Sequence, residues 1–215
     1  MPFHTHISTP TGARIALWHL TETEEALASL LGDEADRKLS SQILSTKRFC
    51  EQATTRLLLD RLDETRGGIL THTREGKPYL TNRPGHLSIS HTRQWVAIAW
   101  HPTRPLGIDI ERLGARVERV AARVFNENEL QAHSDPPHSH TLWLHLCWSA
   151  KEALFKAMPE AGIDFRTQLH VDPPRTLDHA GLFTAVENRT SAHGRYTLWY
   201  ATHDEWVMVC ATPLP

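Results

Sequence analysis

Two short stretches in the second half of the chain carry the residues best suited to chemistry. The segment Gly107-Ile108-Asp109-Ile110-Glu111 places two carboxylates two residues apart in an apolar run. Alternate residues of a β-strand point to the same side, so we expect Asp109 and Glu111 to project together while Ile108 and Ile110 face the core. Paired carboxylates suit a hard cation such as magnesium. Short D-x-E patterns are common, however, and taken alone this one is better explained as an exposed strand face.

The second stretch is Trp148-Ser149-Ala150-Lys151-Glu152-Ala153-Leu154-Phe155-Lys156. Its i, i+3, i+4, i+7 spacing puts Trp148, Lys151, Glu152 and Phe155 on one side of a helix. A solvated Glu–Lys pair is the ordinary explanation, but it does not account for two aromatic rings on the charged side. An acid flanked by lysines on a partly buried face is typical of a site. Three acids with nearby lysines favour magnesium-dependent chemistry on a phosphate ester or anhydride.

Composition limits the class of protein. The chain has 215 residues, 40% of them hydrophobic and 22% charged, which fits a globular protein of one or two domains. A net charge of -2 gives no global attraction to nucleic acid or membrane, and we expect neither as a partner. Three widely spaced cysteines and a polar N-terminus predict a cytoplasmic protein without a disulfide framework or signal peptide. No run approaches the ~20 apolar residues that span a bilayer.

Periodicity and turn residues predict an α+β fold. Thr21 with Glu24 forms a capping-box pattern that predicts the start of a first helix, which runs to Leu31. Further helices are expected over residues 33–44, 45–64 and 141–158, the last stopped by Pro159. Strands are expected over residues 13–20, 79–81, 87–90, 95–100, 107–111, 180–187, 195–201 and 205–211.

The chain is expected to divide after Pro105. Pro102 and Pro105 punctuate it just before the Gly107 strand. We predict two similar, pseudo-duplicated halves, residues 1–105 and 106–215, each a small antiparallel sheet packed against helices.

The two main motifs, in this order and spacing, are identified as those of a known family. The pattern G-x-D-x-E followed by W-x-x-K-E-x-x-x-K resembles the larger, Sfp-type 4'-phosphopantetheinyl transferases of the holo-acyl-carrier-protein synthase superfamily. Gly76-Lys77-Pro78, Ser90-His91-Thr92 and Val124-Phe125 with Glu129 match further elements of that pattern. Where the family often has F-N before x-S-H, this chain has Leu87-Ser88, so a serine replaces an asparagine.

The resemblance implies a role for each matching residue. It implies a site in the cleft between the two halves, where coenzyme A binds. It also implies that the phosphopantetheine arm of coenzyme A is transferred to a serine of an apo acyl or peptidyl carrier protein, with release of adenosine 3',5'-bisphosphate. Asp109, Glu111 and Glu152 would hold magnesium, or manganese in its place; Glu152, or else Glu111, would be the general base. Lys156 would lie near the pyrophosphate. The coenzyme A contacts implied in addition are Arg48, Arg56, Lys77, Ser90, His91, Lys151 and Lys156 itself.

Partner and pathway are less closely defined. A chain with two halves can form the site as a monomer, which we expect, and the carrier protein could serve fatty-acid, polyketide or nonribosomal-peptide biosynthesis. Arg112, Arg116, Arg119 and Arg123 recur at helical spacing, so an arginine stripe that docks an acidic carrier competes with a solvated arginine face. Two other functions remain open: a non-catalytic binder of coenzyme A or carrier protein on the same fold, and an unrelated metal-dependent phosphohydrolase.

Overall fold

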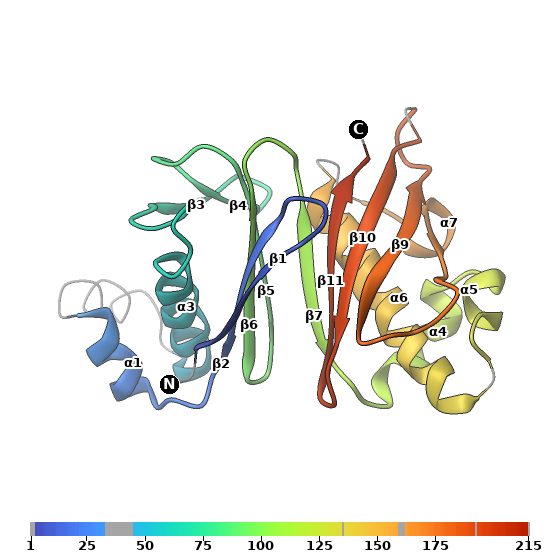
Figure 1. Cartoon of the computed structure of the whole chain (residues 1–215), viewed down its shortest axis with the longest axis horizontal. Helices are drawn as coiled ribbons and strands as arrows, with labels where there is room; N and C mark the ends of the chain where they lie inside the picture. The colour runs from blue at the N-terminus through green and yellow to red at the C-terminus, as the bar shows by residue number, and fades with distance from the viewer. Residues whose placement is uncertain (1–2, 33–44, 135, 159–161, 192, 215) are drawn as a thin grey trace.

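The structure, a computed structural model, describes residues 3–32, 45–134, 136–158, 162–191 and 193–214, without the side chains of residues 3, 4, 116, 137 and 138. Two antiparallel sheets pack face to face in the middle of the molecule, and helices cover the outer face of each (Figure 1). This arrangement confirms the predicted α+β class with antiparallel sheets against helices.

The first sheet is built from residues before Pro102. Its strand order is β1-β2-β6-β5, and each neighbouring pair is antiparallel. The strands are β1 (Phe3–Ser8), β2 (Arg14–His19), β5 (His86–Thr92) and β6 (Trp95–His101). Helices α1 (Glu24–Leu31) and α3 (Thr46–Leu59) lie on its outer face. A small hairpin of β3 (Leu70–His72) and β4 (Pro78–Leu80) follows α3.

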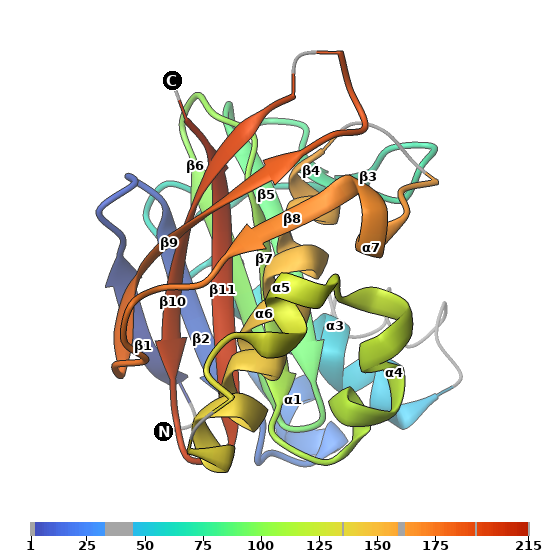
Figure 2. The same cartoon turned by 90° about the vertical axis from the view of Figure 1, so that its right-hand side faces the viewer.

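The second sheet is built from residues after Pro105. Its order is β7-β11-β10-β9-β8, again antiparallel throughout. The strands are β7 (Gly107–Arg112), β8 (Leu169–Asp172), β9 (Ala180–Glu187), β10 (Arg195–Thr202) and β11 (Trp206–Pro213). The helices are α4 (Arg116–Val124), α5 (Glu127–Gln131), α6 (Pro137–Ala157) and α7 (Phe165–Gln168). Figure 2 shows α4 and α5 beside α6 on the outer side of this sheet.

Alternation along the strands separates three apolar layers. On β7, Ile108 and Ile110 point into the core between the two sheets, together with Ile15 and Leu17 of β2. The intervening residues of each strand face the helices: Trp18 packs toward α3, for example. On β11, Val207 and Val209 pack toward α6 for the same reason. Asp109 therefore has to point out of the inter-sheet core, on the α6 side.

Most expected elements are confirmed, with shifted ends. The first helix begins at Glu24, and Thr23, not Thr21, caps it by accepting a hydrogen bond from the Ala26 N–H, so the predicted capping box is wrong. Helix α3 ends at Leu59, before the predicted Glu64. The helix expected over 33–44 and the stop at Pro159 lie outside the described residues. Strands β1, β3 and β8 were not predicted, because β1 is mostly polar and β3 and β8 have only three and four residues, too few for a clear period-two signal.

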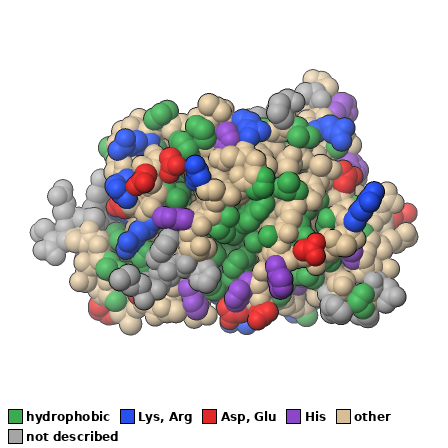
Figure 3. Space-filling model, in the orientation of Figure 1, with side chains coloured by type: hydrophobic (Ala, Val, Ile, Leu, Met, Phe, Trp, Pro, Cys, Tyr) green, Lys and Arg blue, Asp and Glu red, His purple; other side chains and the backbone are tan. Residues whose placement is uncertain are grey.

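No helix of the described ranges is long and apolar enough to cross a membrane. On the face shown in Figure 3, lysine and arginine side chains are interspersed with acids. This mixture is what a net charge of -2 leads one to expect.

Gly107 lets α6 pack directly onto β7. A Cβ atom built at this position would lie 1.9 Å from the carbonyl oxygen of Ala153 and 2.8 Å from the amide nitrogen of Ala157. Both atoms belong to helix backbone and cannot swing away. The glycine that opens the G-x-D-x-E pattern is thus required for close approach, and that approach sets the height of α6 over Asp109.

Replacing Gly107 by alanine tests this close packing. We expect Gly107→Ala to lower the free energy of unfolding by at least about 2 kcal/mol, because backbone of α6 must move. Gly114→Ala is the matched control, since a Cβ there meets nothing within 4 Å, and it should change stability by no more than about 0.5 kcal/mol. Equal effects of the two substitutions in urea unfolding would contradict the packing argument.

Candidate active site at the seam between the sheets

The candidate site is centred on Asp109 of β7, whose side chain is almost fully buried. Its Oδ1 accepts hydrogen bonds from Lys156 Nζ at 2.8 Å and from Ser90 Oγ at 2.9 Å. Its Oδ2 is buried and has no hydrogen-bond partner among the described residues. Burying a carboxylate oxygen without a hydrogen-bond donor costs free energy, so this oxygen is a candidate ligand-binding atom.

Serine side chains hold the two sheets together at this point. The hydroxyl oxygen of Ser88 accepts from the Ile108 N–H at 3.0 Å, and that of Ser90 accepts from the Ile110 N–H at 3.2 Å. Strands β5 and β7 belong to different sheets and lie side by side, joined by these hydroxyl groups. We call this junction the seam. It brings Ser90 from the first sheet into direct contact with Asp109 from the second.

Lys156 ties the end of α6 to the seam. Its Nζ donates to Asp109 Oδ1, to Ser90 Oγ at 3.0 Å and to the carbonyl oxygen of Ile108 at 3.0 Å. Lys77, from the turn before β4, donates to the backbone carbonyl of Lys156 at 3.3 Å. The structure therefore brings four of the predicted site residues, Lys77, Ser90, Asp109 and Lys156, into one contact network from both parts of the chain.

Glu152 faces the same network from one turn earlier on α6. Burial raises the pKa of its carboxyl above the usual value, the nearby Asp109 charge raises that pKa further, and Lys156 partly offsets both. The effect of the Asp109 charge on the Glu152 carboxyl indicates that the two groups lie near each other. Glu111 lies two residues beyond Asp109 on β7 and is partly exposed.

These acids fit a divalent cation in part. Within the described ranges, no three His, Cys, Asp or Glu side chains are gathered closely enough to form a ready-made metal site. The expected trio with Glu111 is thus not assembled. Asp109 and Glu152 do fit, because one offers an unpartnered buried oxygen and the other a carboxyl whose charge is opposed by its neighbour. A cation between them would relieve both effects.

Comparison with known proteins identifies a family for the part of the chain that carries Asp109, Glu152 and Lys156. Residues 105–211, the second sheet with its helices, match the model of the 4'-phosphopantetheinyl transferase superfamily. The chain belongs to that superfamily.

Individual relatives carry corresponding names. A 4'-phosphopantetheinyl transferase of Bacillus subtilis is 36% identical over 85 residues, covering 38% of this chain and 37% of the relative. The 4'-phosphopantetheinyl transferase gsp of Aneurinibacillus migulanus is 30% identical over 136 residues, covering 63% and 49%. The 4'-phosphopantetheinyl transferase Sfp of Bacillus subtilis strain 168 is 31% identical over 137 residues, covering 62% and 52%. The matches thus span between about a third and a half of these relatives.

One residue of the superfamily pattern has a different place from the one expected. Lys151 was predicted to contact coenzyme A, but its side chain is completely buried in the interior of the second half of the chain. Its Nζ donates to the carbonyl oxygens of Val124, Phe165 and Leu169 and pairs with Glu129 at 2.7 Å. With its donors engaged in the interior, Lys151 cannot reach a ligand in this structure, and the prediction is corrected to a structural role.

The remaining predicted contacts line the first half. Arg48 is exposed and Arg56 partly exposed on α3, and the half-exposed His91 follows Ser90 on β5. The arginine stripe is interrupted, because Arg112 ends strand β7 and only Arg116, Arg119 and Arg123 fall on α4. The four arginines therefore do not share one helix as predicted; the side chain of Arg116 lies outside the described residues.

Sequence reasoning gave no place to Ser88 in the site and none to Glu51. Ser88 was noted only as a departure from the superfamily pattern, yet it closes the seam through Ile108. Glu51 of α3 lies 3.4 Å from His91 Nδ1, a contact between distant segments that no local pattern announces.

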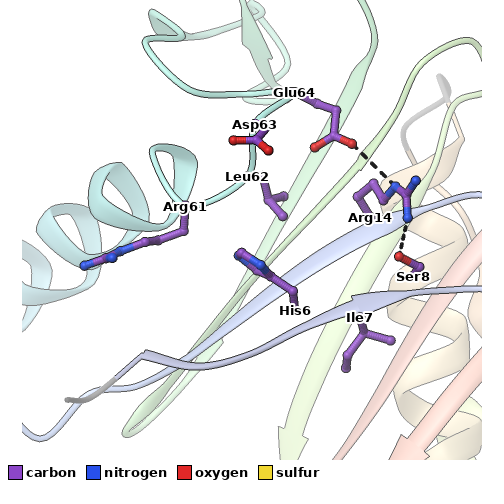
Figure 4. A pocket seen from close by; sticks show the side chains of 8 residues that line it. All are labelled: His6, Ile7, Ser8, Arg14, Arg61, Leu62, Asp63 and Glu64. Atoms are coloured by element: carbon purple, nitrogen blue, oxygen red, sulfur yellow. Dashed lines mark hydrogen bonds and ion pairs between the residues drawn. The ribbon is translucent and has the colours of Figure 1, made fainter.

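A surface hollow of about 170 Å³ lies elsewhere, between strands β1 and β2 and the turns that follow α3 (Figure 4). Arg14 reaches across it to Ser8 and to Glu64, 3.4 Å away. Because β1 is the far edge of the first sheet from β5, this hollow is remote from the seam. Arg14 and Glu64 pair with each other there, and the hollow is not the candidate active site.

Titration of Glu152 tests the electrostatics of the seam. Without added metal, we expect a pKa above the usual glutamate value by carboxyl-carbon NMR. Asp109→Asn removes a charge that raises the pKa, so the value should fall; Lys156→Met removes a charge that lowers it, so the value should rise. Asp204→Asn, in an exposed turn, is the control and should leave Glu152 unchanged. If the pKa of Glu152 stayed the same in both the Asp109 and the Lys156 variants, Glu152 would not interact with these two groups.

The structural role of Lys151 predicts a large loss of stability. Lys151→Met leaves the Glu129 carboxylate buried without its partner and should cost about 3–5 kcal/mol in urea unfolding. Adding Glu129→Gln should recover part of that loss, because the unpaired charge is gone. Asp63→Asn breaks an exposed pair of the same 2.7 Å length with Arg66 and should cost under about 1 kcal/mol. A Lys151→Met protein as stable as the Asp63 variant would refute the assignment.

Proposed function

We propose that this chain transfers the 4'-phosphopantetheine arm of coenzyme A to a serine hydroxyl of an apo carrier protein, acting as a magnesium-dependent transferase. Membership of the superfamily supports this activity, as do the names of its relatives. The observation that carries the proposal is the seam itself: an almost buried aspartate with one unpartnered oxygen, a second acid beside it and a lysine bound to the first.

The reaction needs a serine oxygen to attack a phosphorus atom of the pyrophosphate. A new P–O bond to the serine forms, the bond to the bridging oxygen breaks, and adenosine 3',5'-bisphosphate leaves. Asp109 and Glu152 would hold the divalent cation, with Glu111 as the third candidate. Magnesium, or manganese, when bound there would supply charge neutralisation on the anhydride oxygens.

The chain's own residues supply positioning and proton transfer. Glu152 is the preferred acceptor of the serine proton, because its raised pKa brings the carboxylate closer in basicity to the task. Glu111 is the competing base. Lys156 would stabilise charge developing on the departing oxygen by exchanging its contact with Asp109 for one with the substrate. Ser90 and Lys77 hold this lysine in place from the first half of the chain.

The two parts of the chain divide these tasks in our proposal. Residues 1–105 would bind coenzyme A through Arg48, Arg56, Lys77, Ser90 and His91. Residues 106–215 would carry the metal site and the catalytic helix. We further propose a monomer acting in the cytoplasm, in keeping with three buried free thiols, on the carrier protein of a fatty-acid, polyketide or nonribosomal-peptide pathway.

Intact-mass measurement tests the transfer. The protein is incubated with coenzyme A, magnesium and a panel of apo carrier proteins, and the carriers are weighed. We expect the addition of one phosphopantetheine to at least one carrier, and a loss of about a hundredfold or more in rate for Glu152→Gln. Glu64→Gln, a paired glutamate at the remote edge, should keep the wild-type rate.

The alternative outcomes are distinct. Binding of coenzyme A without transfer to any carrier would favour a non-catalytic binder. Release of phosphate without a carrier would indicate a phosphohydrolase. Absence of coenzyme A binding would contradict the proposed use of the seam altogether.

A further inference from the structure

Glu51 is a nearly buried acid outside the network described above. It lies on the face of α3 that packs on the first sheet, and its side chain is only 11% exposed. Its Oε1 lies 3.4 Å from Nδ1 of His91 and 3.7 Å from Nζ of Lys47. Burying a carboxylate carries a desolvation cost, which is reduced here by contact with two basic groups.

The two basic partners differ in what they need from Glu51. Lys47 is one turn earlier on the same helix and its side chain is 74% exposed, so water solvates it without help. His91 comes from β5, a different element, and only about half of its side chain is exposed at 51%. Glu51 therefore has its larger structural effect on the imidazole, whose position it links to α3.

The contact also selects which ring nitrogen is available. A carboxylate next to Nδ1 favours a hydrogen on that nitrogen, because the carboxylate can accept it in a hydrogen bond. Nε2 is then the nitrogen that remains to contact a ligand. A protonated imidazole held in this way can donate its Nε2–H to an anionic oxygen. His91 is the next residue after Ser90, whose hydroxyl contacts Asp109 and Lys156. Successive side chains of a strand point to opposite sides, so His91 lies on the α3 side of β5. A ligand bound by both residues would therefore extend from the seam past this strand.

We propose that Glu51 is a positioning residue, which orients His91 so that the imidazole binds an anionic phosphate oxygen of coenzyme A. This inference rests on the proposed function, because it takes coenzyme A as the ligand of the seam. It assigns Glu51 to substrate binding, with no part in bond making or breaking.

A double-mutant cycle tests the proposal. Glu51→Gln keeps the size of the side chain and removes its charge. We expect it to raise both the Kd for coenzyme A, measured by calorimetry, and the KM for coenzyme A by about 3- to 10-fold, with kcat and the KM for the carrier unchanged. In a His91→Ala background the same substitution should change these values less than about twofold, because the group it orients is absent.

Matched variants separate positioning from general damage. Glu64→Gln removes a glutamate that is also 3.4 Å from its basic partner, but at the remote edge, and should leave Kd and KM unchanged. Lys47→Ala should change Kd less than twofold, which excludes Lys47 as the group that Glu51 serves. If Glu51→Gln lowers the melting temperature markedly, Glu51→Asp, which keeps the charge but shortens the side chain, is used in the same cycle with the same expectation.

The outcomes distinguish this inference from the function beneath it. Equal effects of Glu51→Gln with and without His91, a fall in kcat alone, or no difference from Glu64→Gln would overturn the role of Glu51 while transfer by the wild type still stood. Conversely, a wild-type protein that transfers nothing but shows the expected coupling in the Kd for coenzyme A would leave the positioning role intact and refute the transferase.

Discussion

The structure depends on how a charged carboxylate is kept at the junction of two sheets. Asp109 is almost buried where β5 meets β7, and such a charge must be compensated. Lys156 and Ser90 compensate one of its oxygens, while Ser88 and Ser90 accept the neighbouring β7 amide hydrogens. The same few side chains therefore close the seam and leave one oxygen without a donor from the described residues. The stability of the junction and, in our proposal, its capacity to bind a cation arise from one arrangement.

Helix α6 serves this arrangement with two lysines that have opposite roles. Lys151 is an interior anchor, held by three carbonyl oxygens and by Glu129, which also caps α5 and accepts from the Val171 N–H. This anchor fixes the rotation of the helix, and Gly107 fixes its distance from β7. Glu152, the next residue, is thereby turned toward Asp109 and carries a raised pKa. Burial raises the pKa of this carboxyl, which supports our proposal that it acts as the base.

Much of this could be predicted from the sequence, because the deciding patterns are local. Alternation along β7 correctly placed Ile108 and Ile110 in the core with Asp109 on the other side. Helical spacing found α6 but could not say which of its lysines would be buried, since the partners of Lys151 are backbone carbonyls, which carry no residue signature. The first N-cap was misplaced by two residues, because Thr21 and Thr23 are chemically equivalent candidates. Ser88 and Glu51 act between distant segments, where only the folded chain reveals the contact.

The most direct test of the account is a crystal structure of the protein with coenzyme A and manganese, with the metal located by anomalous diffraction. We predict a manganese peak beside Asp109 Oδ2 and Glu152, coenzyme A in contact with residues of both sheets at the seam, and Lys156 directed toward the pyrophosphate. Coenzyme A bound away from the seam, or a metal peak remote from Asp109 with the Asp109–Lys156 pair unchanged, would contradict it.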